Sequence, residues 1–260
     1  MTDSVLYVYA IAREAVKPHV EAIDQSSEFG SVSRGRVHAI YTPVAREEYS
    51  QETLDRRSGD LDWLGSIGYR HQAVVSHLMR ETAIIPLRAF TLFSSTESLG
   101  SYLEGSGPAL DKLLDRLDGK QEWTLQIEFD PKKWNDALVH RVASMRDLTR
   151  QIESAGAGKA FLLRKKLDEE RKRASRAAEE ELVAEIEKAV LAKLACQTIV
   201  ENREDRDGAF PQINVLINRD EDAALQEIHL SVADRHAEDG VTVAISGPWP
   251  PYTFARVDNG

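Results

Sequence analysis

The sequence predicts an α+β protein with two domains, covering residues 1–130 and 131–260. Three observations support this prediction. A length of 260 residues fits two small domains or one large one. In the first half, strand and helix patterns follow one another in the order of a ferredoxin-like split βαβ sheet that carries a helical insertion. The second half combines a small sheet with helices, including one long charged helix over about 159–195, where neither proline nor glycine occurs.

Composition and charge argue against several classes of protein. The formal net charge of −10 opposes binding to nucleic-acid phosphates, because the chain has no net cationic field. No run approaches the ~18 apolar residues that span a bilayer, and the first residues, MTDSVLYVYA, lack the basic start of a targeting segment. The single cysteine, Cys196, excludes an internal disulfide and a cysteine metal cluster. We therefore expect a soluble, cytoplasmic protein that binds neither nucleic acid nor membrane.

The first elements alternate between strands and helices. Val5–Ile11 and Val37–Val44 are rich in aromatic and β-branched residues, which favours strands. Between them, apolar residues at helical spacing predict a helix over Arg13–Ile23, and Gly30–Gly35 is predicted to be a polar loop. A polar helix over residues 45–58 is predicted to follow the second strand.

A helix and a strand are predicted back to back between Asp60 and Phe93. Asp60 can cap the first turn of the helix. The inward stripe of this helix consists of Leu61, Leu64, Ile67, Val74, Val75, Leu78 and Met79. Residues Ala83–Phe93 then carry apolar side chains on both faces, which predicts an interior strand covered on each side. Arg88 is the exception, and its charge there requires a partner or a route to solvent.

Helices dominate the middle of the chain. A helix is predicted to begin at Thr96, to be interrupted at Gly105–Pro108 and to continue to Leu117. Glu122–Asp130 alternates apolar and polar residues, and we expect this strand to complete the first sheet. A further helix starts at Pro131, where a first turn tolerates proline. The middle of the long helix is nearly all charge and alanine, so we expect it to project or to pair with the preceding helix as an antiparallel hairpin.

The second sheet and an aromatic segment complete the chain. Residues 197–201 and 213–217 are predicted to form a β-hairpin. A helix over Glu221–His236 and a strand over Val241–Ile245 follow. The last segment, Gly247–Phe254 (GPWPPYTF), contains three prolines, which favour extended backbone and hold the aromatic side chains as stiff anchors.

The sequence contains no pattern typical of a catalytic or metal site. No G-x-S-x-G, Walker, H-E-x-x-H or G-x-G-x-x-G motif occurs. His71 and His77 are separated by six positions, whereas metal-binding pairs on a helix use three or four, so we expect His71 to be a hydrogen-bonding residue. We predict that the protein is not an enzyme and holds no metal or cofactor. Catalysis by His71 with a nearby carboxylate is the hypothesis least supported.

Two tryptophans, Trp63 and Trp249, each have two interpretations. Truncation of a tryptophan packed in the core costs ~3–5 kcal/mol. An exposed tryptophan instead serves as an aromatic anchor in a partner's groove. Core packing is favoured for Trp63, and both interpretations stay open for Trp249, which lies between prolines.

Several motifs recur together in one family. The stretches that carry them are Asp60–Leu64, His71–Val75, Pro86–Phe93, Gly158–Lys165, Asn214–Ile217 and Gly247–Phe254. They are similar to D-L-x-W-L, H-x-x-V-V, P-L-R-F-G-T-x-F, G-x-A-Y-L-x-x-K, N-x-A-Y-L-V and G-P-W-P-P-Y-S-F. In the third motif this chain has Ala89-Phe90 in place of Phe-Gly. Taken together, the motifs resemble the gas vesicle proteins of the GvpL/GvpF type.

This resemblance implies an accessory factor in gas vesicle formation, interacting with the small hydrophobic shell protein and with other accessory proteins. We expect a chaperone-like assembly factor, cytoplasmic and associated with gas vesicles, whose first half covers apolar surface of the shell protein; edge-strand pairing is one route. The candidate partner-binding residues are Trp63, Arg88, Phe90, Trp249, Pro250 and Tyr252. The alternative hypothesis is a ferredoxin-like small-ligand-binding or sensory module without catalysis.

Overall fold

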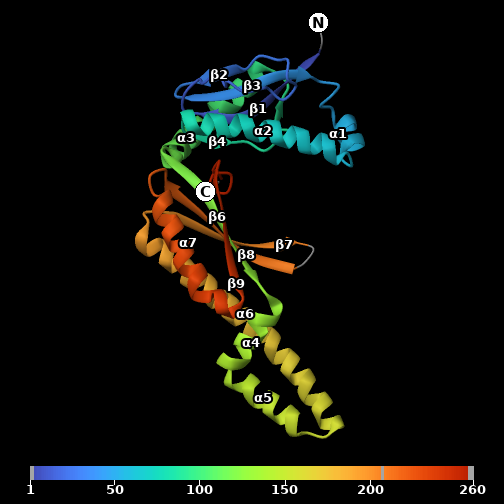
Figure 1. The fold of residues 1–260 in the computed structure, drawn as a ribbon. Coiled ribbons are helices and arrows are strands. Elements are labelled where there is room, and N and C mark those ends of the chain that lie inside the picture. Colours follow the sequence, from blue (N-terminus) through green and yellow to red (C-terminus); the bar gives the residue numbers. More distant parts are fainter. Residues whose placement is uncertain (1–2, 206–207, 257–260) are drawn as a thin grey trace. The chain divides into compact units, whose positions relative to one another are not determined.

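The chain folds into two compact units, in a computed structural model that describes residues 3–205 and 208–256. Unit 1 comprises Met1–Glu122 and Pro248–Gly260, and unit 2 comprises Trp123–Gly247. Each unit combines helices with a sheet (Figure 1). The predicted α+β fold class is therefore confirmed.

The sheet of unit 1 is organised around β1 (Ser4–Ala12). β1 lies between β3 (Val37–Ala45) and β4 (Ile84–Pro86), and β2 (Gly30–Arg34) extends the sheet beyond β3. The short β5 (Leu92–Phe93) also pairs with β1. All of these pairings are antiparallel. The central place of β1 explains why all of its residues but the first are buried.

Unit 1 contains the helices α1 (Gln51–Arg57), α2 (Leu61–Glu81) and α3 (Thr96–Leu117). Each helix begins at a serine or aspartate whose side chain accepts a backbone hydrogen bond from the first turn. α2 contacts β1 and β4, and α3 contacts β2, β3 and β4. The buried hydrophobic side chains of α2 are Ile67, Val74, Val75, Leu78 and Met79.

The second sheet has four strands in the order β7-β8-β6-β9. These strands are β6 (Lys120–Phe129), β7 (Gln197–Asp205), β8 (Gly208–Asn218) and β9 (Val241–Trp249). β7 and β8 form the predicted antiparallel hairpin, and residues 206–207 between them lie outside the described residues. Helices separate β6 from β7 and β8 from β9, which gives the βαββαβ order of a ferredoxin-like fold. This order therefore occurs in unit 2, whereas it was predicted for residues 1–130.

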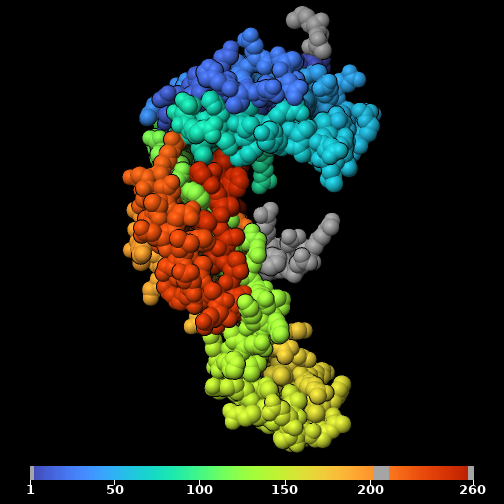
Figure 2. Space-filling model, in the orientation of Figure 1, coloured from blue at the N-terminus to red at the C-terminus, as the bar shows by residue number. Residues whose placement is uncertain are grey.

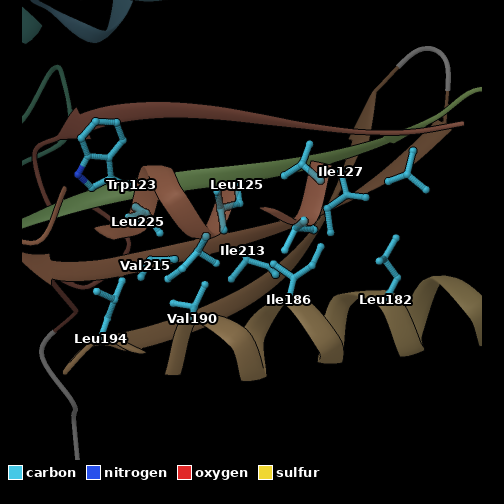
Figure 3. Close-up of a cluster of buried hydrophobic side chains, with 14 of the residues drawn as sticks. Trp123, Leu125, Ile127, Leu182, Ile186, Val190, Leu194, Ile213, Val215 and Leu225 are labelled. Atoms are coloured by element: carbon cyan, nitrogen blue, oxygen red, sulfur yellow. The ribbon is translucent and has the colours of Figure 1, made fainter. Parts of the chain in front are cut away.

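Helices cover this second sheet and extend away from it. α4 (Pro131–Arg141), α5 (Ala143–Ser154) and α6 (Ala157–Lys193) follow β6, and α7 (Asp222–His236) with the 3-10 helix Ala237–Asp239 precedes β9. α6 confirms the predicted long helix, and its first half pairs with α5 as a helical hairpin (Figure 1). Figure 3 shows its last turns packed on the sheet, through Leu182, Ile186, Val190 and Leu194 against Leu125, Ile127, Ile213 and Val215.

The helix predicted over Arg13–Ile23 is wrong, because this segment consists of bends, turns and irregular backbone. Pro18 lacks the N–H that a helix interior requires. The Ile23 N–H donates instead to the Tyr9 hydroxyl on β1 (3.0 Å). The Arg13 guanidinium forms ion pairs with two carboxylates of α3. Tertiary contacts therefore replace the helical hydrogen bonds that the local pattern predicts.

Four further predictions of local structure differ from the structure. Gly30–Gly35, predicted to be a loop, contains β2 because it pairs with β3. Ala83–Phe93, predicted to be one strand, is divided into β4 and β5 by a turn. The interruption predicted at Gly105–Pro108 lies inside α3, which continues through it. Glu122–Asp130, expected to complete the first sheet, contributes instead to the second sheet as β6.

The C-terminal segment Pro248–Phe254 is anchored within unit 1. The buried Glu122 carboxylate accepts hydrogen bonds from the Thr253 N–H (2.9 Å) and the Thr253 hydroxyl (2.6 Å). Arg116 donates to the Phe254 carbonyl (2.7 Å). These charge-assisted bonds place the aromatic segment in unit 1, whereas the sequence analysis groups it with the second half.

Replacing Ile186 with alanine tests the core of unit 2. Ile186 is 1% exposed, so the truncation leaves a cavity and we expect the free energy of unfolding to fall by about 2–5 kcal/mol. Leu191→Ala is the matched control, because Leu191 lies on the same helix but is 49% exposed; its effect should stay within about 0.5 kcal/mol. Chemical denaturation followed by circular dichroism measures both losses, and equal losses would contradict the packing described above.

Candidate functional site

The candidate site lies in unit 1, where the first turns of α2 meet the turn between β4 and β5. Trp63 of α2 contacts Phe90 of the turn, with ring centroids 5.6 Å apart. The Arg57 guanidinium carbon lies 4.3 Å from the centroid of the Trp63 ring, a cation–π geometry. The Asp60 carboxylate caps α2 by accepting from the Trp63 N–H (3.0 Å), and this hydrogen bond lowers the pKa of Asp60. Trp63 is thus held by both its backbone and its ring.

A chain of hydrogen bonds behind this contact joins α2, the turn and β1. The Leu87 carbonyl can only accept, so His71 Nε2 carries the proton in the 3.0 Å contact between them. His71 Nδ1 then accepts from the Tyr7 hydroxyl (3.0 Å), whose oxygen accepts from the Phe90 N–H (3.2 Å). Burial lowers the pKa of His71 and raises that of Tyr7, so both stay neutral. The prediction that His71 is a hydrogen-bonding residue is confirmed.

Phe90 adopts a left-handed backbone conformation, with φ at 65°. This conformation is uncommon for a bulky residue and costs of order 1–3 kcal/mol. The hydrogen bond to Tyr7 and the ring contact with Trp63 offset that cost. The GvpL/GvpF motif has glycine at the position of Phe90, and glycine adopts positive φ without strain. A glycine at this position would be free of the strain that Phe90 carries in this chain.

The other side of α2 exposes apolar side chains to solvent. Leu61 is 79% exposed and Tyr69 is 78% exposed. Gly65 and Gly68 lie between them on the same helical face, and the space that their side chains would fill is open. We call these four residues the α2 outer face. Leu61 was predicted to point inward, and this is wrong because the buried stripe begins only at Ile67.

The α2 outer face was not predicted from the sequence, although its two glycines are a signal that could have indicated it. Two glycines within a helix lower its stability by up to about 1 kcal/mol each relative to alanine. Gly65 and Gly68 have no close neighbour that a side chain would meet, so internal packing gives no reason for them. Glycines on a solvent-exposed helical face, between a leucine and a tyrosine, allow another chain to approach the backbone closely.

The residues predicted to bind partners differ in exposure. Arg88 and Trp249 are exposed, Trp63, Phe90 and Tyr252 are half-buried, and Pro250 is buried. Trp63, Phe90 and Tyr252 pack against one buried cluster of unit 1, so each of the three contributes to the packing of that unit. Arg88 lies on the turn and has the route to solvent that its charge requires. Direct binding by these six residues stays a prediction.

The described residues contain neither a cluster typical of a metal site nor a helix typical of a membrane span. Across residues 3–205 and 208–256, no three histidine, cysteine or acidic side chains are placed to hold a metal ion together. Both ring nitrogens of His71 are engaged by Tyr7 and Leu87. A direct pair between His71 and a carboxylate, which the catalytic hypothesis requires, is therefore not formed. In the same residues, no helix is long and apolar enough to cross a membrane.

Known proteins share sequence with this chain over almost its whole length. The profile of the family described as gas vesicle synthesis protein GvpL/GvpF matches residues 5–256. Gas vesicle protein L of Streptomyces sp. (strain CB03234) is 28% identical over 98% of this chain and 94% of that protein. Gas vesicle protein L2 of Halobacterium salinarum is 30% identical over 75% of this chain and 73% of that protein.

Solved structures share the fold as well. The crystal structure of the gas vesicle protein GvpF from Anabaena sp. PCC7120 superposes with a TM-score of 0.72, at 16% identity, and covers 98% of each chain. GvpF from Microcystis aeruginosa gives a TM-score of 0.68, at 16% identity, over 97% of this chain and 99% of that one. The resemblance inferred from the sequence motifs is confirmed by these matches together with the family profile.

Buried His71 makes the stability of unit 1 depend on pH. Because burial lowers its pKa in the folded state, the unfolded chain takes up a proton first, near its ordinary pKa of about 6.5. The free energy of unfolding should therefore be unaffected by this group above about pH 7 and should fall as the pH decreases through about 6.5 toward the folded pKa. His71→Gln, whose amide can donate to Leu87 and accept from Tyr7, should flatten this dependence. Urea denaturation at several pH values measures it, and an unchanged slope in the variant would assign the dependence to another group.

Replacing Tyr7 with phenylalanine removes the hydroxyl that joins the turn to α2. The Phe90 N–H and His71 Nδ1 lose their partner, so we expect the free energy of unfolding to fall by about 1–3 kcal/mol. Tyr69→Phe is the matched control, because Tyr69 is 78% exposed; its effect should stay within about 0.5 kcal/mol. Urea denaturation at neutral pH compares the two, and an equal effect would mean that the buried chain of bonds does not stabilise the turn.

Proposed function

The chain belongs to the gas vesicle synthesis protein GvpL/GvpF family, and from this membership we propose that it binds the hydrophobic shell protein of the gas vesicle. In this proposal it also contacts other gas vesicle accessory proteins, and it assists nucleation and assembly rather than catalysing a reaction. Its place of action is the cytoplasm, at the forming vesicle. By covering apolar surface on the shell protein, it keeps that protein from aggregating before it joins the shell.

The observation that supports this proposal is the α2 outer face. Burying a leucine side chain fully contributes about 1.5–3 kcal/mol, and tyrosine is enriched among the residues that dominate binding energy. Leu61 and Tyr69 are both more than three-quarters exposed, so nearly all of that area is available to a partner. Gly65 and Gly68 permit an apolar helix or strand of the shell protein to lie against the α2 backbone.

The structure beneath this face favours rigid recognition. Trp63 and Phe90 lock the start of α2 to the turn, and Arg88 adds an exposed cation beside it. A preformed surface loses less conformational entropy on binding than a flexible one. Edge-strand pairing is the less favoured route, because the edge strand β2 is short and presents serine and arginine side chains to solvent.

The ligand-binding alternative rests on cavities. A cavity of about 590 Å³ in unit 2 falls in the size range of small-molecule sites. However, it is lined mainly by charged and polar side chains of α6, including Lys172, Arg176, Glu179 and Glu180. Arg176 and Glu180 pair with each other (3.1 Å). This lining favours a solvated groove, so shell-protein binding is the proposal we retain.

Co-expression with the principal shell protein tests the proposal on the full-length chain. With a tag on the present protein, we expect shell protein to co-purify and the amount of soluble shell protein to rise. Leu61→Asp and Tyr69→Asp should each lower co-purification by at least about tenfold, since loss of a binding anchor costs about 2 kcal/mol or more. Both side chains are exposed, so the unfolding midpoint should stay close to that of the parent protein.

Leu230→Asp provides the matched control for these variants. Leu230 is also an exposed apolar residue on a helix, 59% exposed on α7 of unit 2, and its replacement should leave co-purification unchanged. Equal co-purification by the parent protein and the two α2 variants would reject the α2 outer face as the binding surface. An absence of co-purification from the folded parent protein would reject direct shell-protein binding itself.

A further inference from the structure

A second exposed apolar surface lies in unit 2, at the start of α6. Phe161 is 68% exposed and Leu162 is 66% exposed. On the inner side of the same turns, Ala160 is buried and Leu163 is half-buried, so the hairpin with α5 leaves the Phe161–Leu162 side uncovered. In the space-filling view, the yellow end of the hairpin stands apart from the sheet and α7 of its own unit (Figure 2).

Cations surround these two apolar side chains. Among residues 159–166 (KAFLLRKK), half are lysine or arginine and none is acidic, in a chain whose net charge is −10. Lys159 and Lys165 lie three positions from Leu162 along the helix, and Arg164 lies three positions from Phe161, so all are surface neighbours. Lys159, Arg164 and Lys165 are exposed, and within the described residues none of the three takes part in an ion pair. We call these five residues the α6 tip.

Helix stability does not account for this composition. The positive end of the helix macrodipole lies at the N-terminus, where acidic residues stabilise and basic residues do not. α6 nevertheless has no acidic residue in its first turn and no side-chain cap, and Lys159 occupies its third position. The first turns of α4 and α5 also lack an acidic residue, whereas those of α1, α2, α3 and α7 each contain one. A lysine in the first turn does not stabilise the start of the helix, so helix stability gives no reason for the basic charge of Lys159.

We propose that the α6 tip is a docking surface for an acidic amphipathic segment of a partner protein. The apolar side chains Phe161 and Leu162 contact the apolar face of that segment, and Lys159, Arg164 and Lys165 pair with carboxylates that flank it. Charge complementarity of this kind speeds association and selects the partner. This proposal does not rest on shell-protein binding, which concerns the α2 outer face in the other unit.

A protein segment fits the α6 tip better than a membrane surface does. The net charge of −10 opposes approach to any extended anionic surface, whereas a single acidic helix meets only the local charge of the tip. The apolar area consists of two side chains, in place of the continuous stripe that interfacial helices bury among lipids. Beyond the tip, the next turns of α6 carry acidic side chains such as Asp168 and Glu169, and these would repel an anionic membrane.

The full-length protein tests this proposal with a designed peptide. The probe is a fluorescent amphipathic helix of about 20 residues, with leucine on one face and glutamate on the other; a second version has glutamine in place of glutamate. Fluorescence anisotropy should show binding of the glutamate peptide that weakens with added salt, and binding of the glutamine peptide at least about tenfold weaker. Two double variants should each weaken binding of the glutamate peptide at least about tenfold. The first combines Phe161→Ser with Leu162→Ser, and the second combines Arg164→Glu with Lys165→Glu.

Matched controls lie at the other end of the same helix. Leu191→Ser and Lys193→Glu change an exposed leucine and an exposed lysine of α6, and they should leave binding unchanged. Lys159→Glu should weaken binding while raising the thermal unfolding midpoint, because an acidic residue in the first turn is favourable for the helix. A merely structural role for Lys159 would not predict opposite effects on the two measurements.

Three results would overturn the proposal. The first is that the folded parent protein does not bind the glutamate peptide. The second is that the α6 tip variants bind it as well as the parent does. The third is that vesicles of anionic phospholipid bind the parent protein, lose that binding in the tip variants and compete with the peptide, which would assign the tip to a lipid surface.

Discussion

A neutral, buried His71 is the group on which the architecture of unit 1 depends. Its two ring nitrogens join α2 to β1 through Tyr7 and to the turn through Leu87. Because the turn holds Phe90 in a left-handed conformation, it needs these bonds and the Trp63 contact to persist. These hydrogen bonds act together with the buried stripe of α2 to hold the helix in a rotation that leaves Leu61 and Tyr69 exposed to solvent.

The rotation of α2 decides which of its side chains are buried in unit 1 and which are exposed to a partner. One side of α2 buries Ile67, Val74 and Leu78, whereas Leu61 and Tyr69 on another side are more than three-quarters exposed. The α6 tip in unit 2 differs in chemistry, because cations surround its apolar side chains whereas glycines separate those of α2. The two proposals assign these surfaces, which differ in charge, to two kinds of partner, an apolar shell subunit and an acidic protein segment. An assembly factor that holds both at once would bring them to the same place.

The sequence predicted the elements whose pattern is local. α6 follows from a long stretch without proline or glycine, and α2 from an apolar stripe behind a capping Asp60. The elements that were predicted wrongly are those whose structure depends on contacts with distant parts of the chain. β2 is polar and becomes a strand by pairing with β3, whereas residues 13–23 have helical spacing but give a hydrogen bond to Tyr9 instead. Of the candidate site, Trp63 and Phe90 were found, but the exposure of Leu61 depends on helix rotation, which tertiary packing sets.

Amide hydrogen exchange of the full-length protein, alone and in complex with shell protein, measures the central interaction most directly. Exchange reports which backbone segments become less accessible or less mobile when a partner binds. We expect slower exchange over the first three turns of α2, with α7 unchanged. Slower exchange confined to other elements, while α2 exchanges as in the free protein, would contradict binding of the shell protein at the α2 outer face.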